Sequence, residues 1–463
     1  MATIIRPGAG PKARAQSAVP LMVGLVLVIA VCAATFADVR YAPVLPYALA
    51  YVAIVAATWR RLAPVALSPA FYLSAYLCVV AVLGVSVGDQ LSGAGGTGFT
   101  DFLLDPAISA RTASALFVAA SLCLIGAALV RRRPSHIAIG DLLDLGDLSK
   151  YAKWFLLIGV VELAVLAYIV GINEIFERDS RLLGRGTNIE TIVSMLAVAV
   201  LVLVGIAFFT SKGALRFLSL VLILGFIAYF VSMGSRRLAL VPLLLLLAYV
   251  FARRGKLSVI PVVIAAVGAV VTLALPLHFR GQASHGLLPY MASLSSFSLS
   301  PEMLATSLNN FVAGFKITAV TGFQSAKIPT EALPISLSPL DGNVVGWYEV
   351  APLLRINRYT PYSAIGELIN YGSLVFVVIL LGLGIVLGFS QVLNDKLLTS
   401  PLGRLVAILA LGLIFMFVIQ SSQYNLRSVV RYIYLALGAQ VIGVVLVYAN
   451  RALHRREGSR ATT

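Results

Sequence analysis

The stretch YFVSMGSRRLALVPLLLLLAYVFARR, residues 229–254, decides how the rest of the chain is interpreted. Arg236 and Arg237 precede an apolar run that ends in two more arginines. If this run crosses a membrane, the two pairs lie on opposite sides, because the two ends of a spanning helix face different compartments. One pair then departs from the rule that positive charge collects on the cytoplasmic side, and this departure requires a physical reason.

The composition of the chain is that of a polytopic membrane protein. Of its 463 residues, 60% are hydrophobic and 12% are charged, which is too little charge for a soluble domain of this length. The net charge of +16 comes from basic loops, and no long basic tract is interleaved with aromatic residues, so the sequence excludes nucleic acid as a partner. Cys32, Cys78 and Cys123 lie inside apolar runs and predict neither a metal site nor a disulfide. We expect one all-α integral membrane domain over residues 1–463.

Apolar runs predict the spanning helices. The N-terminal run has no small-residue cleavage site, so it is predicted to be a retained first helix and not a signal peptide. At roughly 20 apolar residues per span, the sequence predicts about 12 helices. They lie at residues 18–37, 41–59, 63–88, 112–130, 152–171, 190–210, 216–233, 238–252, 258–277, 373–391, 405–421 and 432–450.

Basic residues give these spans a consistent orientation. They precede the first span and follow each even-numbered one, at Arg6, Lys12 and Arg14, Arg60 and Arg61, Arg131 to Arg133, Lys212 and Arg216, Arg253 and Lys256, Lys396 and Arg404, and Arg451 to Arg456. By the positive-inside rule, both termini are cytoplasmic. Residues 278–372 then form an external connection of about 95 residues, far longer than an ordinary loop, and we expect it to contain amphipathic helices lying on the outer face.

This orientation places Arg236, Arg237, Arg280, Arg427 and Arg431 on the outer side, beside or inside apolar spans. A charge costs about 2.5–3.5 kcal/mol at the centre of a span and less toward its end. Snorkelling of the side chain offsets much of that cost. Each arginine therefore has two open explanations, which are anchoring to lipid headgroups and binding of an anion.

The spacing of these arginines favours the anion. Arg427 and Arg431 are four residues apart and share one helical face, where like charges repel unless an anion lies between them. Gly234 and Ser235 predict a turn and an N-cap before Arg236, and a helix N-terminus beside an arginine favours phosphate. Three arginine elements on one side predict a single multiply charged ligand such as a pyrophosphate, which suits the planar fork of arginine.

Glu367 is the candidate general base. Thr360 is predicted to be the N-cap of its helix and Pro361 the first helical residue. The carboxylate is either a surface group paired with Arg358 or a base whose pKa is raised toward neutrality by partial burial. Glu162, near the middle of a span, is expected to be protonated or paired with an arginine.

Several of these stretches resemble the bacterial oligosaccharide repeat-unit polymerases, the Wzy-type O-antigen polymerases, and more distantly the O-antigen ligases. The resemblance rests on GSRRLALVPLLL at 234–245, RGQ at 280–282, the long external connection, and PYSAIGELINYGSLVFVVILLGLG at 361–384. The last stretch is similar to the Pro-Ser-x-x-Gly-Glu…Gly run that precedes a late span in this family. The matching features cover residues 229–434, and the Arg…His pattern late in the external loop of the ligases is absent.

The resemblance implies a glycosyltransferase in the bacterial cytoplasmic membrane. Its donor would be a polyprenyl-pyrophosphate-linked oligosaccharide, and its acceptor a sugar hydroxyl on another such lipid. Pyrophosphate would be bound by Arg236 or Arg237, by Arg280, and by Arg427 or Arg431. Glu367 would activate the acceptor, and Arg280 would neutralise the departing pyrophosphate.

The chemistry of this donor predicts the mechanism. Polyprenyl pyrophosphate is already a good leaving group, so neither a nucleotide nor a metal cofactor is expected if cations neutralise its charge. His278 and His285, seven residues apart, do not have a zinc spacing. Direct attack of the acceptor oxygen predicts inversion at the anomeric carbon. Membrane lipids are further expected partners, and a chain-length regulator is an optional one.

Alternative functions remain open. Besides an O-antigen ligase, a 12-helix transporter or flippase of a lipid-linked sugar has the same topology, although the connection near residues 211–216 is short and the largest hydrophilic segment is external. A glycosyltransferase that uses a monosaccharide-lipid donor would place an acidic motif in a sizeable first external loop. Here that loop, FADVRYAP, contains Asp38 as its only acidic residue.

The orientation can be tested by chemical labelling. We expect cysteines introduced at Ser284 and Ser325 to react with membrane-impermeant thiol reagents in intact cells, because the basic segments place residues 278–372 outside. Labelling only after permeabilisation of the membrane would reverse the topology.

Overall fold

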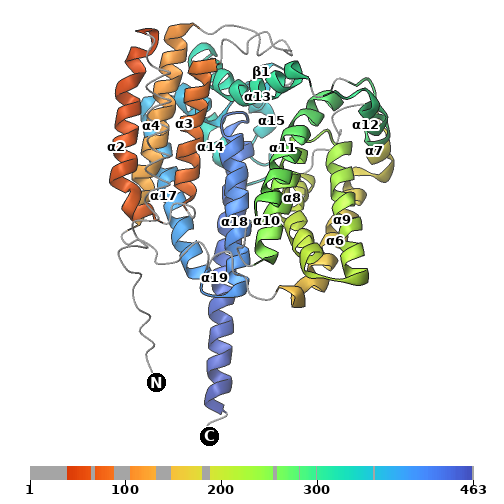
Figure 1. The fold of residues 1–463 in the computed structure, drawn as a ribbon. Helices are drawn as coiled ribbons and strands as arrows, with labels where there is room; N and C mark the ends of the chain where they lie inside the picture. Colours follow the sequence, from red (N-terminus) through yellow and green to blue (C-terminus); the bar gives the residue numbers. More distant parts are fainter. Residues whose placement is uncertain are drawn as a thin grey trace.

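Helices run side by side along the long axis of the molecule (Figure 1). The computed structural model describes residues 39–63, 68–87, 105–131, 148–179, 188–253, 258–280, 282–298, 300–357 and 360–460. Within these ranges, 10 helices are long and apolar enough to cross a membrane. They are α2 (Leu45–Leu62), α3 (Pro69–Val87), α4 (Pro106–Val130), α6 (Ala152–Val170), α8 (Asn188–Thr210), α9 (Gly213–Ser232), α11 (Val259–Arg280), α17 (Ser373–Leu397), α18 (Pro401–Gln420) and α19 (Leu426–Arg460).

These helices confirm the expectation of an all-α polytopic membrane protein. The predicted first span, residues 18–37, lies outside the described residues. The predicted span at 238–252 is a 3₁₀ helix, η4 (Arg236–Leu240), followed by a shorter apolar helix, α10 (Val241–Ala252). Short elements η1 (Val39–Val44), η3 (Ser149–Tyr151) and α7 (Ile172–Phe176) precede or follow spans. The total of about 12 spans therefore stays a prediction.

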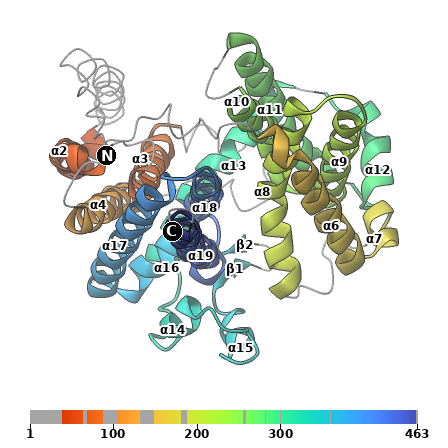
Figure 2. The same ribbon diagram turned by 90° about the horizontal axis from the view of Figure 1, so that it is seen from below.

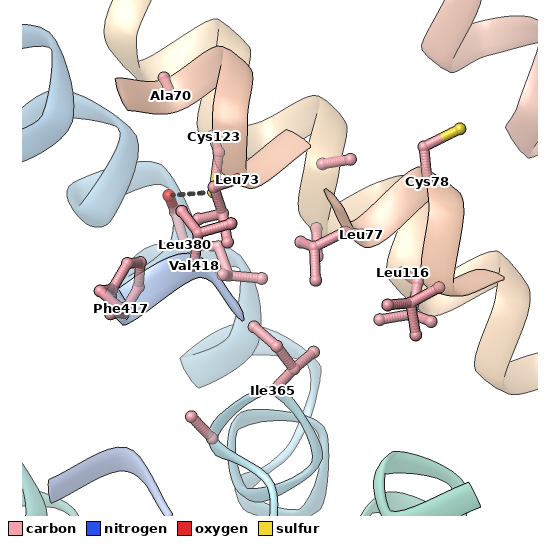
Figure 3. Close-up of a cluster of buried hydrophobic side chains, with 14 of the residues drawn as sticks. Ala70, Leu73, Leu77, Cys78, Leu116, Cys123, Ile365, Leu380, Phe417 and Val418 are labelled. Atoms are coloured by element: carbon pink, nitrogen blue, oxygen red, sulfur yellow. Dashed lines mark hydrogen bonds between the residues drawn. The ribbon is translucent and has the colours of Figure 1, made fainter. Parts of the chain in front are cut away.

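The helices form two groups with separate apolar cores, seen from one end in Figure 2. One core joins α2, α3, α4 and α17 to parts of α18 and α19, and the other joins α6, α8, α9 and α10. Helix α18 belongs to both, because Ala407 and Ile408 pack in the second core while Ile414 and Phe417 pack in the first. In the first core, Cys123 Sγ lies 3.6 Å from Leu380 O, as Figure 3 shows.

Glycines bring α4 and α17 into backbone contact. A Cβ atom on Gly384 would lie 2.4 Å from Cys123 O, and one on Gly126 would lie 2.3 Å from Leu381 O. One turn further, a Cβ on Gly388 would again meet the backbone of α4. Small residues four positions apart permit such close packing where lipid supplies no hydrophobic driving force between helices.

An ion pair between the buried Arg131 and the partly exposed Asp395 joins helices at the end of the bundle that carries the C-terminus (Figure 1). Arg131 Nη2, just after α4, lies 3.2 Å from Asp395 Oδ2 of α17 and donates to Ala63 O, just after α2, at 3.1 Å. Gln391 Nε2 of α17 donates to Leu62 O at 2.9 Å. The basic ends of α2 and α4 therefore meet at one end of the bundle, as the charge pattern predicts.

The chain between α11 and α17, which we call the connecting segment (residues 281–372), folds at the opposite end (Figure 1). It is mostly helical, as expected, and it also contains a two-stranded antiparallel hairpin that the sequence did not predict. Its elements are α12 (Leu287–Ser293), η5 (Leu294–Ser296), α13 (Pro301–Ala319), the π-helix η6 (Val320–Gln324), α14 (Ala332–Leu337), α15 (Trp347–Val350), β1 (Arg355–Asn357), β2 (Thr360–Pro361) and α16 (Ala364–Tyr371).

The contact between α4 and α17 predicts a position-specific effect. Gly384→Ala should destabilise the protein by about 1–3 kcal/mol, because the added methyl group overlaps the backbone of α4. Gly382→Ala, on the same helix, is the matched control, since nothing lies within 4 Å of its added Cβ. Thermal unfolding in detergent should show a lower midpoint for the first variant and no loss for the second. Equal midpoints would contradict the packing.

Candidate functional site

The helix that carries Glu367 begins later than the sequence predicts. Ser363 caps α16, and its Oγ accepts a hydrogen bond from Gly366 N at 2.8 Å. Thr360 and Pro361 form β2 instead, where Thr360 N bonds to Asn357 Oδ1 at 2.9 Å. The prediction of Thr360 as N-cap and Pro361 as first helical residue is therefore wrong, because the hairpin uses these residues.

Helix α16 is fixed against the end of α13 and η6. A Cβ on Gly366 would lie 2.6 Å from Thr321 Cβ, so this approach requires glycine. Asn370 Nδ2 donates to Thr321 O at 3.0 Å and to Ala326 O at 3.1 Å, while its Oδ1 accepts from Ile328 N at 2.9 Å. These contacts determine which face of α16 turns inward.

Glu367 lies on that inward face and is 0% exposed. Its Oε1 accepts a hydrogen bond from Leu426 N at 3.1 Å, whereas Oε2 has no hydrogen-bond partner among the residues the structure describes. Burial raises the pKa of this carboxyl to about 8, and the bond from Leu426 N–H opposes the rise. The direction of this shift is the one expected for a base, burial is complete and not partial as expected, and the alternative of a surface carboxylate is wrong. Its suggested partner Arg358 lies outside the described residues.

Arg427 occupies the first turn of α19 and is 1% exposed. Its Nη1 donates to Ile335 O at 2.7 Å and to Ser338 O at 3.0 Å, and its Nη2 donates to Leu340 O at 2.6 Å. The guanidinium also lies over the ring of Trp347, 5.2 Å from its centroid. These carbonyls follow α14 or end it, so Arg427 caps that helix without needing an anion.

The Gly234–Arg237 turn is built on a buried aromatic ring. Gly234 has a φ of +53°, a conformation that favours glycine, and a Cβ there would lie 3.5 Å from the Tyr290 hydroxyl. Ser235 caps η4 as predicted, with its Oγ accepting from Arg237 N at 3.3 Å. The guanidinium of Arg237 donates to the backbone and side-chain oxygens of Ser194 on α8. Arg237 therefore anchors η4 to α8.

The six predicted site residues fall into two groups. Arg236 and Arg237 lie on η4, which packs against α11, and Arg280 is the last residue of α11. The side chains of Arg236 and Arg280 are outside the described part of the structure. The other group consists of Glu367 on α16 with Arg427 and the half-buried Arg431 on α19. Helix α13 contacts both α11 and α16 and so links the groups.

The sequence predicted that arginines from three elements converge on one anion-binding cavity. For Arg237 and Arg427 this prediction is wrong. The guanidinium groups of these two residues form hydrogen bonds to the protein itself. The candidate anion ligands are thereby reduced to Arg236, Arg280 and Arg431. At two of the five outer-side arginines named in the sequence analysis, hydrogen bonds to protein oxygens therefore explain why a charge lies beside a span.

Other sequence candidates have local roles. His278 Nε2 lies 3.0 Å from Ser293 O, and His285 Nδ1 lies 2.8 Å from the Tyr290 hydroxyl, so both histidines hold α12 in place. Glu162 Oε1 on α6 has no hydrogen-bond partner among the described residues. Within those residues, no group of three or more His, Cys, Asp or Glu side chains could hold a metal ion.

Sequence reasoning missed three buried polar residues near α16: Tyr371, Ser336 and Lys316. Tyr371 is 8% exposed, Ser336 is 0% exposed and Lys316 is 1% exposed. The available signal for Tyr371 was its position four residues after Glu367, which places both on one face of a helix. No comparable signal marked Ser336, because its burial depends on how α14 folds back onto α16 and α19.

A comparison of the chain with protein-family models, with curated proteins and with solved structures finds no match.

The contacts of Arg427 distinguish a cap from an anion ligand. Arg427→Ala and Arg427→Lys should both destabilise the protein, by on the order of 3 kcal/mol for alanine, because an amine cannot bond three carbonyls and stack on Trp347 at once. We expect a lower unfolding midpoint in detergent and faster proteolysis within residues 336–346, with Arg431→Ala as the matched control. An unchanged midpoint with loss of anion binding would contradict the capping role.

Proposed function

We propose that the protein is a glycan polymerase of the Wzy type that joins polyprenyl-pyrophosphate-linked oligosaccharide repeat units. The observation that carries the proposal is Glu367. It is a fully buried carboxyl with a pKa raised to about 8, held on the short helix before a late span, and one of its oxygens has no hydrogen-bond partner among the described residues. A general base works best when its pKa is near the operating pH, and perturbed pKa values cluster at functional sites.

The reaction follows from this carboxylate. Glu367 takes the proton of the acceptor hydroxyl while the hydroxyl oxygen forms a bond to the anomeric carbon of the donor. The bond between that carbon and the pyrophosphate oxygen breaks, and the polyprenyl pyrophosphate leaves with the electron pair. The product is inverted at the anomeric carbon. No nucleotide or metal takes part in this scheme, since the leaving group is already activated.

Arginines neutralise the departing charge in this proposal. Arg280 and Arg236 are the preferred pyrophosphate ligands, because η4 packs against α11 at the end of the bundle that carries the connecting segment. Arg431, one turn after the cap residue Arg427, is the remaining candidate from α19. Preorganised cations aimed at developing negative charge supply much of the catalysis in such reactions.

The proposed location is a bacterial cytoplasmic membrane with both termini in the cytoplasm. The multi-pass architecture supports a membrane location, and the shared position of the basic helix ends supports one cytoplasmic face. The connecting segment would then be external, where the lipid-linked donor and acceptor glycans are its partners. Membrane lipids, and in some settings a chain-length regulator, would complete the assembly.

The test is turnover of a defined pyrophosphate-linked oligosaccharide by purified protein in nanodiscs. Glu367→Gln should lower kcat by about 10²–10⁴-fold while leaving donor binding intact, because it removes only the proton acceptor. Arg280→Ala should lower turnover by on the order of 10²–10³-fold, and Arg280→Lys should recover little. Chelators should have no effect. The Arg427→Lys variant controls for losses that come from instability alone.

The pH profile adds an independent check. A base is active when deprotonated, and the carboxyl of Glu367 has a pKa of about 8. The rate should therefore rise with pH up to about 8 and level off above it, falling by about tenfold per pH unit well below this value. Near-wild-type turnover by both Glu367→Gln and Arg280→Ala would overturn the proposal and favour the transporter.

Deletion of the gene should cause single repeat units to accumulate, whereas a ligase deletion would leave polymer without its anchor.

A further inference from the structure

Three buried oxygen atoms without hydrogen-bond partners gather around α16. They are Glu367 Oε2, the Tyr371 hydroxyl and the Ser336 hydroxyl. Within the described part of the chain none of the three has a partner in hydrogen-bond geometry, although the Ser336 hydroxyl lies close enough to Tyr371 to lower its pKa. The exposed fractions of these residues are 0%, 8% and 0%. Native structures pair the great majority of buried polar atoms, so three unpaired atoms in one place require an explanation.

The fold places these three atoms beside one another. Tyr371 is one helical turn after Glu367, so both side chains leave the same face of α16. Tyr371 packs in the same apolar cluster as Ala332 of α14, and Ser336 is one turn after Ala332 on that helix. The charge of Glu367 raises the pKa of Tyr371 beyond the effect of burial, while the nearby Ser336 hydroxyl lowers it, so both groups act on the tyrosine.

The chemistry of the three groups determines what fits between them. Two hydroxyls can each donate and accept a hydrogen bond, and Glu367, whose pKa of about 8 keeps it mainly protonated at neutral pH, can do the same. Arg427 of α19 uses both terminal nitrogens on carbonyl groups, and Lys327 donates to the backbone oxygen of Asn370 on α16, so both of these cations already have neutral partners. A small neutral group that both donates and accepts satisfies all three oxygens.

We propose that Glu367, Tyr371 and Ser336 bind a single neutral hydroxyl group, with Tyr371 and Ser336 orienting it toward Glu367 Oε2. That hydroxyl belongs to a water molecule or to a sugar. Its assignment to the acceptor sugar during turnover rests on the proposed function, whereas the binding of a hydroxyl does not.

Helix α14 supplies one side of this site. Ser336 belongs to α14, whose C-terminal carbonyls are held by Arg427 and by the Tyr434 hydroxyl, which donates to Leu337 O. The site is occupied by water between turnovers and by the acceptor during them.

Infrared difference spectroscopy tests the binding without relying on activity. The carboxyl band of Glu367 is identified as the band lost in Glu367→Gln. Tyr371→Phe and Ser336→Ala should shift this band, because each removes a partner of the bound hydroxyl. Tyr362→Phe, a buried tyrosine of the same cluster, is the matched control and should leave the band in place. Exchange into heavy-oxygen water should move an additional O–H band in the substrate-free protein, which identifies the ligand as water.

Turnover then distinguishes the two sources of the hydroxyl. If the acceptor occupies the site, Tyr371→Phe should raise the KM for the lipid-linked acceptor or lower kcat by about 10- to 100-fold, with donor binding unchanged and Tyr362→Phe near wild type. A shifted band with normal turnover would overturn the acceptor assignment and leave a water site. An unshifted band in both Tyr371→Phe and Ser336→Ala would overturn the hydroxyl site itself. An active Glu367→Gln variant would remove the proposed function but would not alter the spectroscopic result.

Discussion

The guanidinium group of Arg427 is the contact on which the connecting segment depends. The carbonyl groups at a helix C-terminus have no partners within the helix, and leaving them unpaired beside hydrocarbon is costly. Arg427 satisfies three such carbonyls at and after α14 and stacks on Trp347 of α15. Because Arg427 belongs to the first turn of α19, this contact ties α14 and α15 directly to a spanning helix. Ala332 of α14, in turn, packs in the same apolar cluster as Tyr371 of α16.

Some buried polar groups around α16 have hydrogen-bond partners and others have none among the described residues. Ser363 and Asn370 use their polar atoms on neighbouring backbone or side-chain groups, and they fix the helix in place. Glu367, Tyr371 and Ser336, in contrast, each have a buried oxygen without a partner in hydrogen-bond geometry among the residues that the structure describes. Their position beside one carboxyl is the observation on which the proposed hydroxyl site rests. The raised pKa of Glu367 follows from the same burial, since a charged carboxylate is poorly solvated there.

The two ends of the bundle use arginine differently. At the end that carries the C-terminus, Arg131 pairs with Asp395 and a backbone carbonyl, so its charge is balanced by an acid. At the other end, Arg237 and Arg427 bond to neutral oxygens of the protein. This answers in part the question raised by the arginine pair after Gly234. Arg237 anchors η4 to α8. The candidates that remain for binding an anion are Arg236, Arg280 and Arg431.

The sequence by itself determined the class of the protein, most span positions, the shared end of the basic clusters and the choice of Glu367 as the residue of interest. These features depend on local hydrophobicity, on charge next to spans and on one helical motif, all of which are properties of contiguous residues. Only the tertiary structure decided that Thr360 and Pro361 form a strand, that Arg427 caps α14 and that Ser336 and Tyr371 lie beside Glu367. Each of these outcomes depends on contacts between residues distant in sequence, such as the bond from Leu426 N to Glu367. A pattern along the chain cannot specify which buried partner satisfies a polar group, because burial and pairing are set when the elements pack together.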